Sequence, residues 1–294
     1  MTATSQTITD ELRRWIVAQA EAGCRPQDVV QAMKASGWDE DVAIGAMEQT
    51  LRQHLQLTPV DDAAEPAADS AASAPANRVP QPELAGASEI TLSDGHTVRV
   101  LTAQSKPRLI VFGGLLSDAE CDALMDEARP KLSRSETVDN ATGGSEINAA
   151  RTSDGMFFER AHSPLIAAIE ERIAELLRWP VEHGEGLQIL RYHPGAEYRP
   201  HHDYFDPVHP GTPKILERGG QRVGTLIVYL NTPLAGGATV FPDVGVDVSP
   251  LRGNAVFFSY DRPHVSTKTL HGGAPVTAGE KWVATKWLRE GVFS

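Results

Sequence analysis

The chain has 294 residues, of which 41% are hydrophobic and 22% charged, a composition typical of globular proteins and a length that suits one large and one small domain. Its 27 Lys and Arg against 39 Asp and Glu give a net charge of −12, and so acidic a surface repels phosphate backbones and argues against a nucleic-acid substrate. The two cysteines, Cys24 and Cys121, fall in separate predicted helices, which excludes a disulfide framework and a cysteine-rich metal site.

The N-terminal stretch MTATSQTITDELRRW lacks the basic start and the apolar run of a secretory signal. No stretch approaches the roughly 18 uninterrupted apolar residues that a membrane span requires. We therefore expect a cytoplasmic protein with no membrane-spanning segment.

Residues 1–56 predict a small module of three short helices. Apolar residues recur at helical spacing in each helix, Pro26 suits an early helical position, and Asp39 can cap the third helix. The stretch MKASGWDEDVAIGAME resembles ubiquitin-associated-type modules, which implies a protein partner for these helices. A plain accessory bundle is the alternative.

Residues 57–86 consist mainly of Ala, Pro, Asp and Ser, with almost no large apolar side chains. Such a segment cannot bury enough surface to offset the entropy lost on ordering. We predict a flexible linker between the helical module and a main domain over residues 87–294.

The first part of the main domain combines strands and helices. ITLSDGHTVRV predicts a hairpin with its turn at Asp94-Gly95, and residues 109–112 continue as a strand. Ser117 and Glu120 form a capping box at the start of one helix, and Ser163-Pro164 opens another with a strong apolar stripe.

After Trp179-Pro180 the pattern changes to short apolar runs, separated by Gly and Pro. The strand-like runs are LQILRY, TLIVYL, ATVFP, NAVFFS and KWVATKWL. Several strands at this spacing indicate a sandwich or jelly roll, and the preceding helices would cover one sheet. The expected fold class is α+β with a mainly β core.

The triplet His201-His202-Asp203 is a candidate metal site. On a strand, residues i and i+2 share a face, so His201 and Asp203 can bind one ion together while His202 points away. A further histidine from a distant strand would complete a two-histidine, one-carboxylate set, which leaves coordination positions open and is typical of non-heme Fe(II) oxygenases. His271 is the preferred third ligand, and the competing candidates are His193, His209 and His264.

Lys281 lies ten residues after His271 and suggests a cosubstrate. An Fe(II) oxygenase needs a reductant to split O₂, and a 2-oxo acid can supply two electrons while it chelates the metal. Its far carboxylate then needs a fixed cation, which a buried Lys281 can provide. Tyr192 and Thr239 can add hydroxyl hydrogen bonds. Taken alone, Lys281 would be interpreted as a surface lysine.

Residues from about 107 to 291 resemble the prolyl 4-hydroxylase family of 2-oxoglutarate- and Fe(II)-dependent dioxygenases, which we identify as the bacterial type. The matching stretches are RTSDGMFF (151–158), GLQILRYHPGAEYRPHHDYF (186–205), QRVGTLIVYLNTPLAGGATVFP (221–242), LHGGAPV (270–276) and GEKWVATKW (279–287). The resemblance implies a double-stranded β-helix, with the iron and 2-oxoglutarate core at about 186–290.

The resemblance also implies roles for individual residues. His201, Asp203 and His271 would bind iron, and Lys281, with Tyr192 and Thr239 nearby, would bind the distal carboxylate of 2-oxoglutarate. Tyr198, Arg222 and Trp287 would line the place where peptide and cosubstrate meet, and Arg151 belongs to a segment that resembles a mobile loop closing over the peptide. Structural alternatives exist for these groups: packing for Tyr198, an ion pair or the surface for Arg222, the core for Trp287 and, in the segment that holds Arg151, a simple turn at Gly155.

The expected activity is hydroxylation of a prolyl residue at its 4-position in a peptide or protein, with O₂ consumed, 2-oxoglutarate converted to succinate and ascorbate as an added reductant. The alternatives are the same chemistry on a free amino acid or another side chain, a nucleic-acid dioxygenase disfavoured by the charge, and a jelly-roll binding module without turnover. His202 stands where the family often has an aromatic or apolar residue. The peptide-binding and tetramerising parts of animal collagen enzymes have no counterpart here, so collagen is not implied as a substrate.

Overall fold

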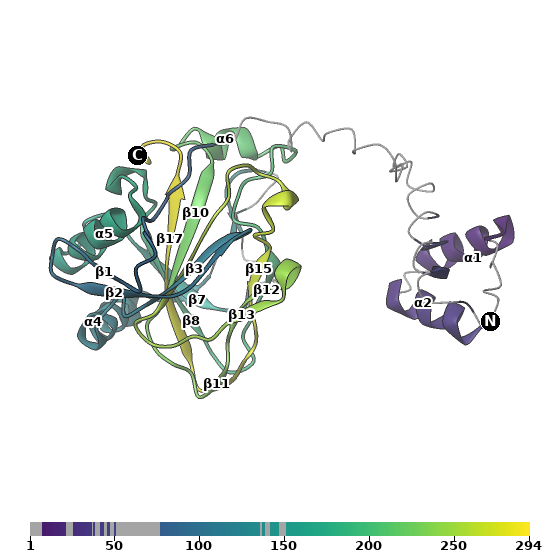
Figure 1. Cartoon of the computed structure of the whole chain (residues 1–294), viewed down its shortest axis with the longest axis horizontal. Coiled ribbons are helices and arrows are strands. Elements are labelled where there is room, and N and C mark those ends of the chain that lie inside the picture. The colour runs from purple at the N-terminus through teal and green to yellow at the C-terminus, as the bar shows by residue number, and fades with distance from the viewer. Residues whose placement is uncertain are drawn as a thin grey trace. The chain divides into compact units, whose positions relative to one another are not determined.

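A computed structural model gives the fold of the chain (Figure 1). The structure describes residues 8–21, 26–36, 38, 42–43, 46–47, 50, 77–135, 137–138, 142–146 and 151–294. It divides into two compact units, Met1–Asp69 and Ser70–Ser294. Among the helices described, none has the length and apolar character needed to cross a membrane.

The first unit contains helices α1 (Asp10–Glu21) and α2 (Pro26–Ala35). Their apolar stripes meet in a small core that includes Ile16, Val30 and Met33, as the helical spacing predicts. Most of the predicted third helix lies outside the described residues. The resemblance to ubiquitin-associated modules therefore stays a prediction.

The second unit is built mainly from antiparallel strands in two sheets. The large sheet has nine strands in the order β1 (Glu89–Thr91), β2 (Thr97–Ser105), β3 (Arg108–Gly113), β14 (Ala255–Ser259), β10 (Arg222–Tyr229), β17 (Lys281–Arg289), β8 (Leu187–Tyr192), β7 (Asp154–Phe158) and β4 (Ser133–Arg134). The small sheet has the order β13 (Val246–Val248), β12 (Thr239–Phe241), β15 (His271–Gly273) and β9 (Tyr198–His201). Two further pairs join β11 (Ala235–Gly236) to β16 (Val276–Ala278) and β5 (Thr137–Val138) to β6 (Ser145–Glu146).

Two sheets of antiparallel strands, with strands far apart in the sequence as neighbours, form the double-stranded β-helix that the family resemblance implies, a form of the jelly roll that the strand-like runs predict. The fold class α+β with a mainly β core is confirmed. The predicted hairpin is present as β1 and β2, with Gly95 at φ +82° in its turn, a conformation that glycine adopts at little cost.

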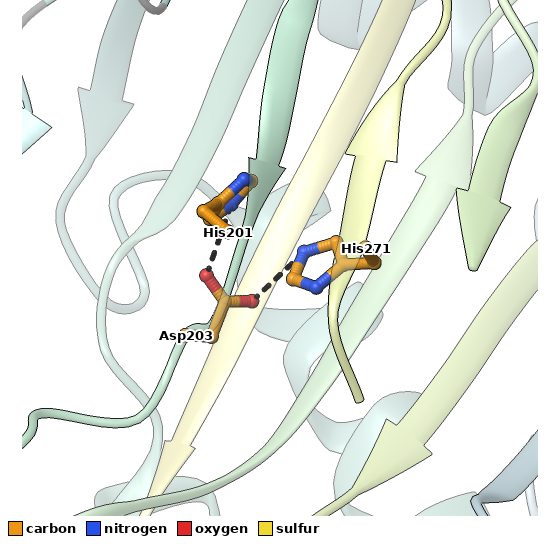
Figure 2. Close-up of side chains that lie close together, drawn as sticks. All are labelled: His201, Asp203 and His271. Carbon is orange, nitrogen blue, oxygen red and sulfur yellow. Dashed lines mark ion pairs between the residues drawn. The ribbon is translucent and has the colours of Figure 1, made fainter. Parts of the chain in front are cut away.

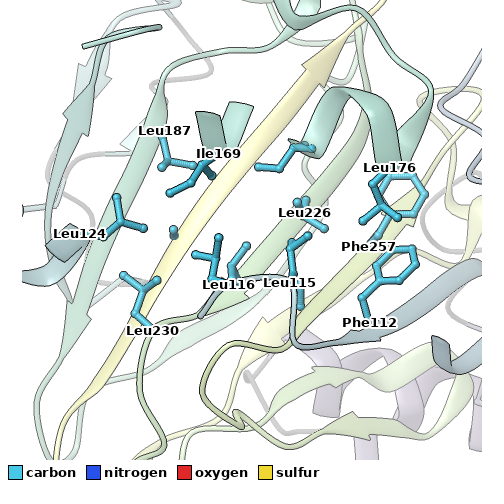
Figure 3. Packing of buried hydrophobic residues seen from close by; sticks show 14 of the residues in the cluster. Phe112, Leu115, Leu116, Leu124, Ile169, Leu176, Leu187, Leu226, Leu230 and Phe257 are labelled. Atoms are coloured by element: carbon cyan, nitrogen blue, oxygen red, sulfur yellow. The ribbon is translucent and has the colours of Figure 1, made fainter. Parts of the chain in front are cut away.

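Helices α4 (Asp118–Ala128) and α5 (Pro164–Leu177) lie on one face of the large sheet (Figure 1). Both begin as predicted, because Ser117 and Glu120 form a capping box and the Ser163 side chain accepts a hydrogen bond from the backbone of the first turn of α5. Figure 3 shows the core between helices and sheet. Its residues include Leu124, Ile169, Leu176, Leu187, Leu226 and Phe257. The other face of the large sheet, which the helices do not cover, packs against the small sheet.

The remaining helical segments are short and connect strands. They are α6 (Thr212–Leu216) and the 3₁₀ turns η1 (Arg129–Lys131), η2 (Val181–His183), η3 (Pro242–Val244) and η4 (Val265–Thr267).

The predicted linker differs from the structure at its C-terminal end. The Asn77 backbone N–H donates a hydrogen bond to the Asp261 carbonyl over 2.7 Å, and Val79 and Leu84 pack against the core of the second unit. These are among the few large apolar residues of the segment, and their burial offsets the entropy of ordering the chain around them. Residues 77–86 therefore belong to the second unit, and residues 57–76 lie outside the described part of the chain.

Removal of residues 1–86 is expected to lower the melting temperature of the second unit, whereas removal of residues 1–76 should leave it unchanged. Loss of two partly buried apolar side chains and their backbone hydrogen bonds should cost about 2 kcal/mol, which corresponds to roughly 5 °C for a domain of this size. Thermal unfolding of the two truncated proteins, compared with the full chain, measures the effect. Equal melting temperatures would show that the segment adds no stability.

Candidate metal centre and active site

Strands β9 and β15 place two histidines opposite each other. His271 pairs with His201 in the register of the small sheet, and Asp203 lies just beyond the end of β9. The Asp203 carboxylate oxygens lie 3.6 Å from His201 Nε2 and 3.4 Å from His271 Nε2 (Figure 2). One ligand atom from each residue lies within 4.8 Å of the others, so the three side chains can bind one ion.

The predicted reason for this convergence is only partly right. His201 is the last residue of β9 and Asp203 lies in the bend that follows, so the two do not share one face of a regular strand. The carboxylate turns back towards the imidazole from the bend. The His202 ring stacks on Tyr204, with ring centroids 4.7 Å apart, and is not a member of the metal-binding group, as predicted.

The two imidazoles are oriented in the same way. His201 Nδ1 lies 2.9 Å from the Arg199 carbonyl oxygen, and His271 Nδ1 lies 3.0 Å from that of Thr269. A carbonyl oxygen only accepts hydrogen bonds, so each Nδ1 carries the hydrogen and each Nε2 keeps its lone pair for a metal.

The protonation states also suit a metal centre. Burial lowers the pKa of His271 to about 4, although the Asp203 carboxylate opposes that shift. Burial would raise the pKa of Asp203, but the neighbouring His271 and His201 outweigh it and hold that pKa well below its ordinary value. At neutral pH the centre therefore offers the neutral imidazole of His271 and the ionised carboxylate of Asp203, and together with His201 this donor set fits Fe(II) with coordination positions left for other ligands.

A hydroxyl chain holds the carboxylate. The Thr225 hydroxyl donates to Asp203 Oδ2 over 2.7 Å, so its contact of 2.9 Å with the Tyr260 hydroxyl is one in which the tyrosine donates. Neither Thr225 nor Tyr260 was singled out from the sequence.

A cavity of about 40 Å³ adjoins the three ligands and is lined by Tyr192, Thr239 and Lys281. Lys281 is 4% exposed, and its Nζ lies 5.5 Å and 5.7 Å from the ring centroids of Tyr192 and Tyr229. Within the described part of the chain no carboxylate forms an ion pair with it. Burial lowers its pKa to about 8. A buried cation of this kind, beside a metal centre, fits the far carboxylate of a bound 2-oxo acid.

Tyr229 is a further residue of this cavity region that sequence reasoning missed. Its hydroxyl donates to Thr239 Oγ1 over 2.8 Å, so the Thr239 hydroxyl hydrogen is available to donate to a ligand in the cavity. The sequence contains a pattern that could have identified Tyr229. Alternation along β10 places Thr225, Ile227 and Tyr229 on one face, while Leu226 and Val228 belong to the core with the helices.

A family model described as the 2OG-Fe(II) oxygenase superfamily matches residues 187–289. Prolyl 4-hydroxylase 2 of Arabidopsis thaliana is 38% identical over 219 residues, which cover 66% of this chain and 71% of the relative. Prolyl 4-hydroxylase 1 of the same plant is 43% identical over 202 residues, or 63% and 69% of the two chains. The chain belongs to the prolyl 4-hydroxylase family.

This family member is a 2-oxoglutarate- and Fe(II)-dependent dioxygenase. Among solved structures, the collagen prolyl hydroxylase of Paramecium Bursaria Chlorella virus-1, in complex with 2-oxoglutarate, is 30% identical, covers 62% of this chain and 94% of its own, and has a TM-score of 0.47. The two relatives are plant enzymes, so the narrower prediction of a bacterial type has no support from them.

The dioxygenase also has a larger groove beside its metal centre. This groove, of about 720 Å³, is lined by residues of β4, β7 and β9 together with all four predicted substrate residues, Arg151, Tyr198, Arg222 and Trp287. It also contains His201 and Asp203 in its wall. A molecule in the groove would therefore lie against the metal centre.

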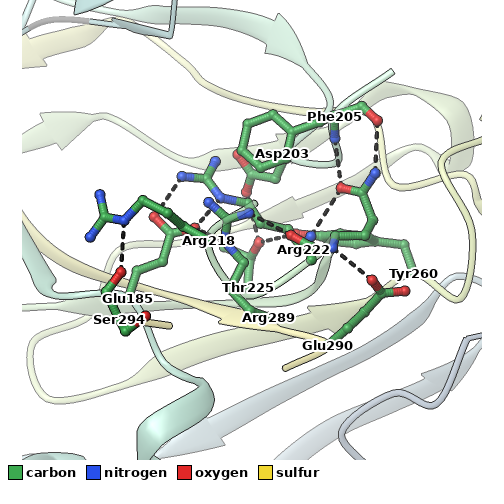
Figure 4. A network of polar contacts seen from close by, with 12 residues as sticks. Glu185, Asp203, Phe205, Arg218, Arg222, Thr225, Tyr260, Arg289, Glu290 and Ser294 are labelled. Atoms are coloured by element: carbon green, nitrogen blue, oxygen red, sulfur yellow. Dashed lines mark hydrogen bonds and ion pairs between the residues drawn. The ribbon is translucent and has the colours of Figure 1, made fainter. Parts of the chain in front are cut away.

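Arg222 both lines the groove and forms an ion pair, so its predicted position and its structural alternative are compatible. It lines the groove, and it forms a buried ion pair with Glu185, with Nε–Oε1 and Nη2–Oε2 distances of 2.6 and 2.9 Å (Figure 4). Glu185 also accepts from Arg289 Nε over 2.6 Å, and the Arg222 guanidinium lies 4.0 Å from the Trp287 ring centroid. Glu185 thus fixes the arginine that holds one wall of the groove.

The segment predicted to be mobile is in part a strand. Arg151 bridges to Tyr198 in the small sheet and its Nη2 donates to Gln188 over 2.7 Å. Asp154–Phe158 forms β7 of the large sheet, where a Cβ at Gly155 would lie 2.6 Å from Ser135 Oγ. Glycine is needed there for close packing and not for a turn.

The competing histidines are explained by other contacts. His193 lies between Asp154 and Glu280, at 3.1 and 3.2 Å, and the His264 side chain caps η4. His209 lines the groove. None of the three belongs to the metal-binding group found among the described residues.

Proposed function

We propose that this dioxygenase hydroxylates prolyl residues at the 4-position in a peptide or protein and converts 2-oxoglutarate to succinate. The observation that carries the proposal is that a small cavity and a large groove both adjoin one metal centre. The small cavity with buried Lys281 suits the cosubstrate, and the large groove accommodates a chain that continues beyond the reacting residue.

When bound, iron and 2-oxoglutarate activate O₂ for insertion of one oxygen atom into a C–H bond. The protein binds and orients. His201, Asp203 and His271 hold the ion, while the Lys281 ammonium and the Thr239 hydroxyl bind the far carboxylate. The Trp287 ring, packed against the Arg222 guanidinium, forms an apolar wall that excludes water from the substrate side.

The breadth of the groove favours a peptide over a free amino acid, which would leave most of about 720 Å³ unfilled. The net charge of −12 argues against nucleic acid. Four further parts of the proposal rest on sequence patterns. They are a cytoplasmic location, ascorbate as the added reductant, a protein partner for residues 1–56 and the bacterial type.

The test is incubation of the protein with Fe(II), 2-oxoglutarate, ascorbate and proline-rich peptides, with free proline as a parallel substrate. We expect a gain of about 16 Da on the peptide, matched by succinate, and amino-acid analysis should identify 4-hydroxyproline. Succinate without peptide hydroxylation would point to another substrate. Hydroxylation of free proline alone would overturn the peptide assignment.

A further inference from the structure

His201 is the metal ligand that the protein encloses least. It ends the edge strand β9 of the small sheet, and its side chain is 22% exposed, against 4% for His271 and 5% for Asp203. The His271 ring packs against Phe258, with ring centroids 4.5 Å apart, and Asp203 is held by the Thr225 hydroxyl. The His201 ring needs an equivalent constraint from elsewhere.

Tyr198 supplies that constraint. Its ring stacks on the His201 imidazole, with centroids 3.7 Å apart and planes inclined by 27°. The hydrogen bond from His201 Nδ1 to the Arg199 carbonyl fixes one atom of the ring, and the stacked face restricts its tilt about that bond. The two contacts together direct Nε2 towards Asp203.

Tyr198 is itself held from several directions. Its backbone pairs with Gly273 on one side and bridges to Arg151 on the other. The Arg151 guanidinium carbon also lies 4.8 Å from the tyrosine ring centroid, within the range of a cation–π contact. Because the tyrosine ring is fixed, it constrains the orientation of the imidazole that stacks on it.

We propose that Tyr198 is a positioning residue for the metal ligand His201, so that metal affinity depends on an aromatic ring at position 198. Groups that orient metal ligands from outside the coordination shell typically change metal affinity about 10- to 100-fold. Tyr198 also lines the groove, so a bound substrate contacts the same ring that holds a ligand. This role goes beyond substrate binding and does not depend on the identity of the peptide.

The experiment measures Mn(II) binding to the full-length, metal-stripped protein without peptide or 2-oxoglutarate, from the electron paramagnetic resonance signal of free Mn(II). Tyr198→Leu and Tyr198→Met remove the ring, and Tyr198→Phe removes only the hydroxyl. Phe157→Leu is the matched control, because Phe157 is another aromatic residue of the groove that is 54% exposed and has no ring contact with His201 among the described residues.

We expect the dissociation constant for Mn(II) to rise about tenfold or more in the Leu and Met variants and to stay within about twofold in the Phe and control variants. Methionine is unbranched and adapts to irregular space, so it keeps the test valid if the leucine variant fails to fold, which thermal unfolding reveals. Wild-type affinity in a folded Tyr198→Met protein would overturn the proposal. Peptide hydroxylation by the wild-type protein tests the proposed function separately. The Mn(II) affinities and the hydroxylation assay can therefore fail independently of each other.

Discussion

Replacement of Asp203 by Ala is expected to abolish turnover and to weaken Mn(II) or Fe(II) binding at least about 100-fold. The variant removes the anionic ligand of the metal-binding group and leaves two imidazoles. It also leaves the Thr225 hydroxyl without the acceptor that it has in the wild type. A dication held by two neutral nitrogens alone loses most of its electrostatic stabilisation.

Metal titration of the purified variant, together with succinate and hydroxyproline assays, measures both effects. Asp247→Ala is the matched control, since Asp247 is an exposed carboxylate on β13 of the same small sheet and lies outside the metal-binding group. The control should bind metal and turn over as the wild type does. An Asp203→Ala protein that kept wild-type metal affinity would place the ion elsewhere.

Replacement of Lys281 by Met is expected to raise the dissociation constant for 2-oxoglutarate at least about 100-fold while metal affinity stays within about twofold. The ammonium is a buried cation of the small cavity, and its loss leaves the far carboxylate of the ligand desolvated without the ammonium that neutralises it. Isothermal titration in the presence of Mn(II) separates the two affinities. Lys268→Met, at an exposed lysine after η4, is the control.

The affinity for 2-oxoglutarate should also depend on pH through Lys281. Burial lowers the pKa of this lysine to about 8, so the ligand-free protein holds the ammonium below that pH and loses it above. Each pH unit above about 8 should therefore raise the dissociation constant about tenfold. In Lys281→Arg the guanidinium stays charged, and the alkaline loss of affinity should disappear. An equally steep loss in the arginine variant would assign the titration to another group.

Local signals in the sequence predicted most of the individual elements. The serine and glutamate that start α4 form their capping box from residues three apart, and the short apolar run LQILRY forms the strand β8. These contacts depend on neighbours in the sequence, so composition and periodicity were enough to find them. The short spacing of His201 and Asp203 likewise marked both as ligands, although the bend after β9, and not a shared strand face, brings them together.

Contacts between distant segments had to come from the tertiary structure. The chain has ten histidines, and without the family resemblance several could serve as the third ligand. The register of β9 against β15 selects His271. Glu185 and Tyr229 escaped notice because their partners, Arg222 and Thr239, meet them only through the packed sheets.

The fold class, two of the metal ligands and the family follow from short-range spacing and from the order of motifs, which the amino-acid sequence carries directly. Three features are known from the packed structure alone: residues 77–86 pack on the second unit, Lys281 is buried without a carboxylate partner among the described residues, and Tyr198 stacks on His201. Burial and ring contacts depend on how strands pair and pack across long separations in the chain, and no local pattern encodes that pairing.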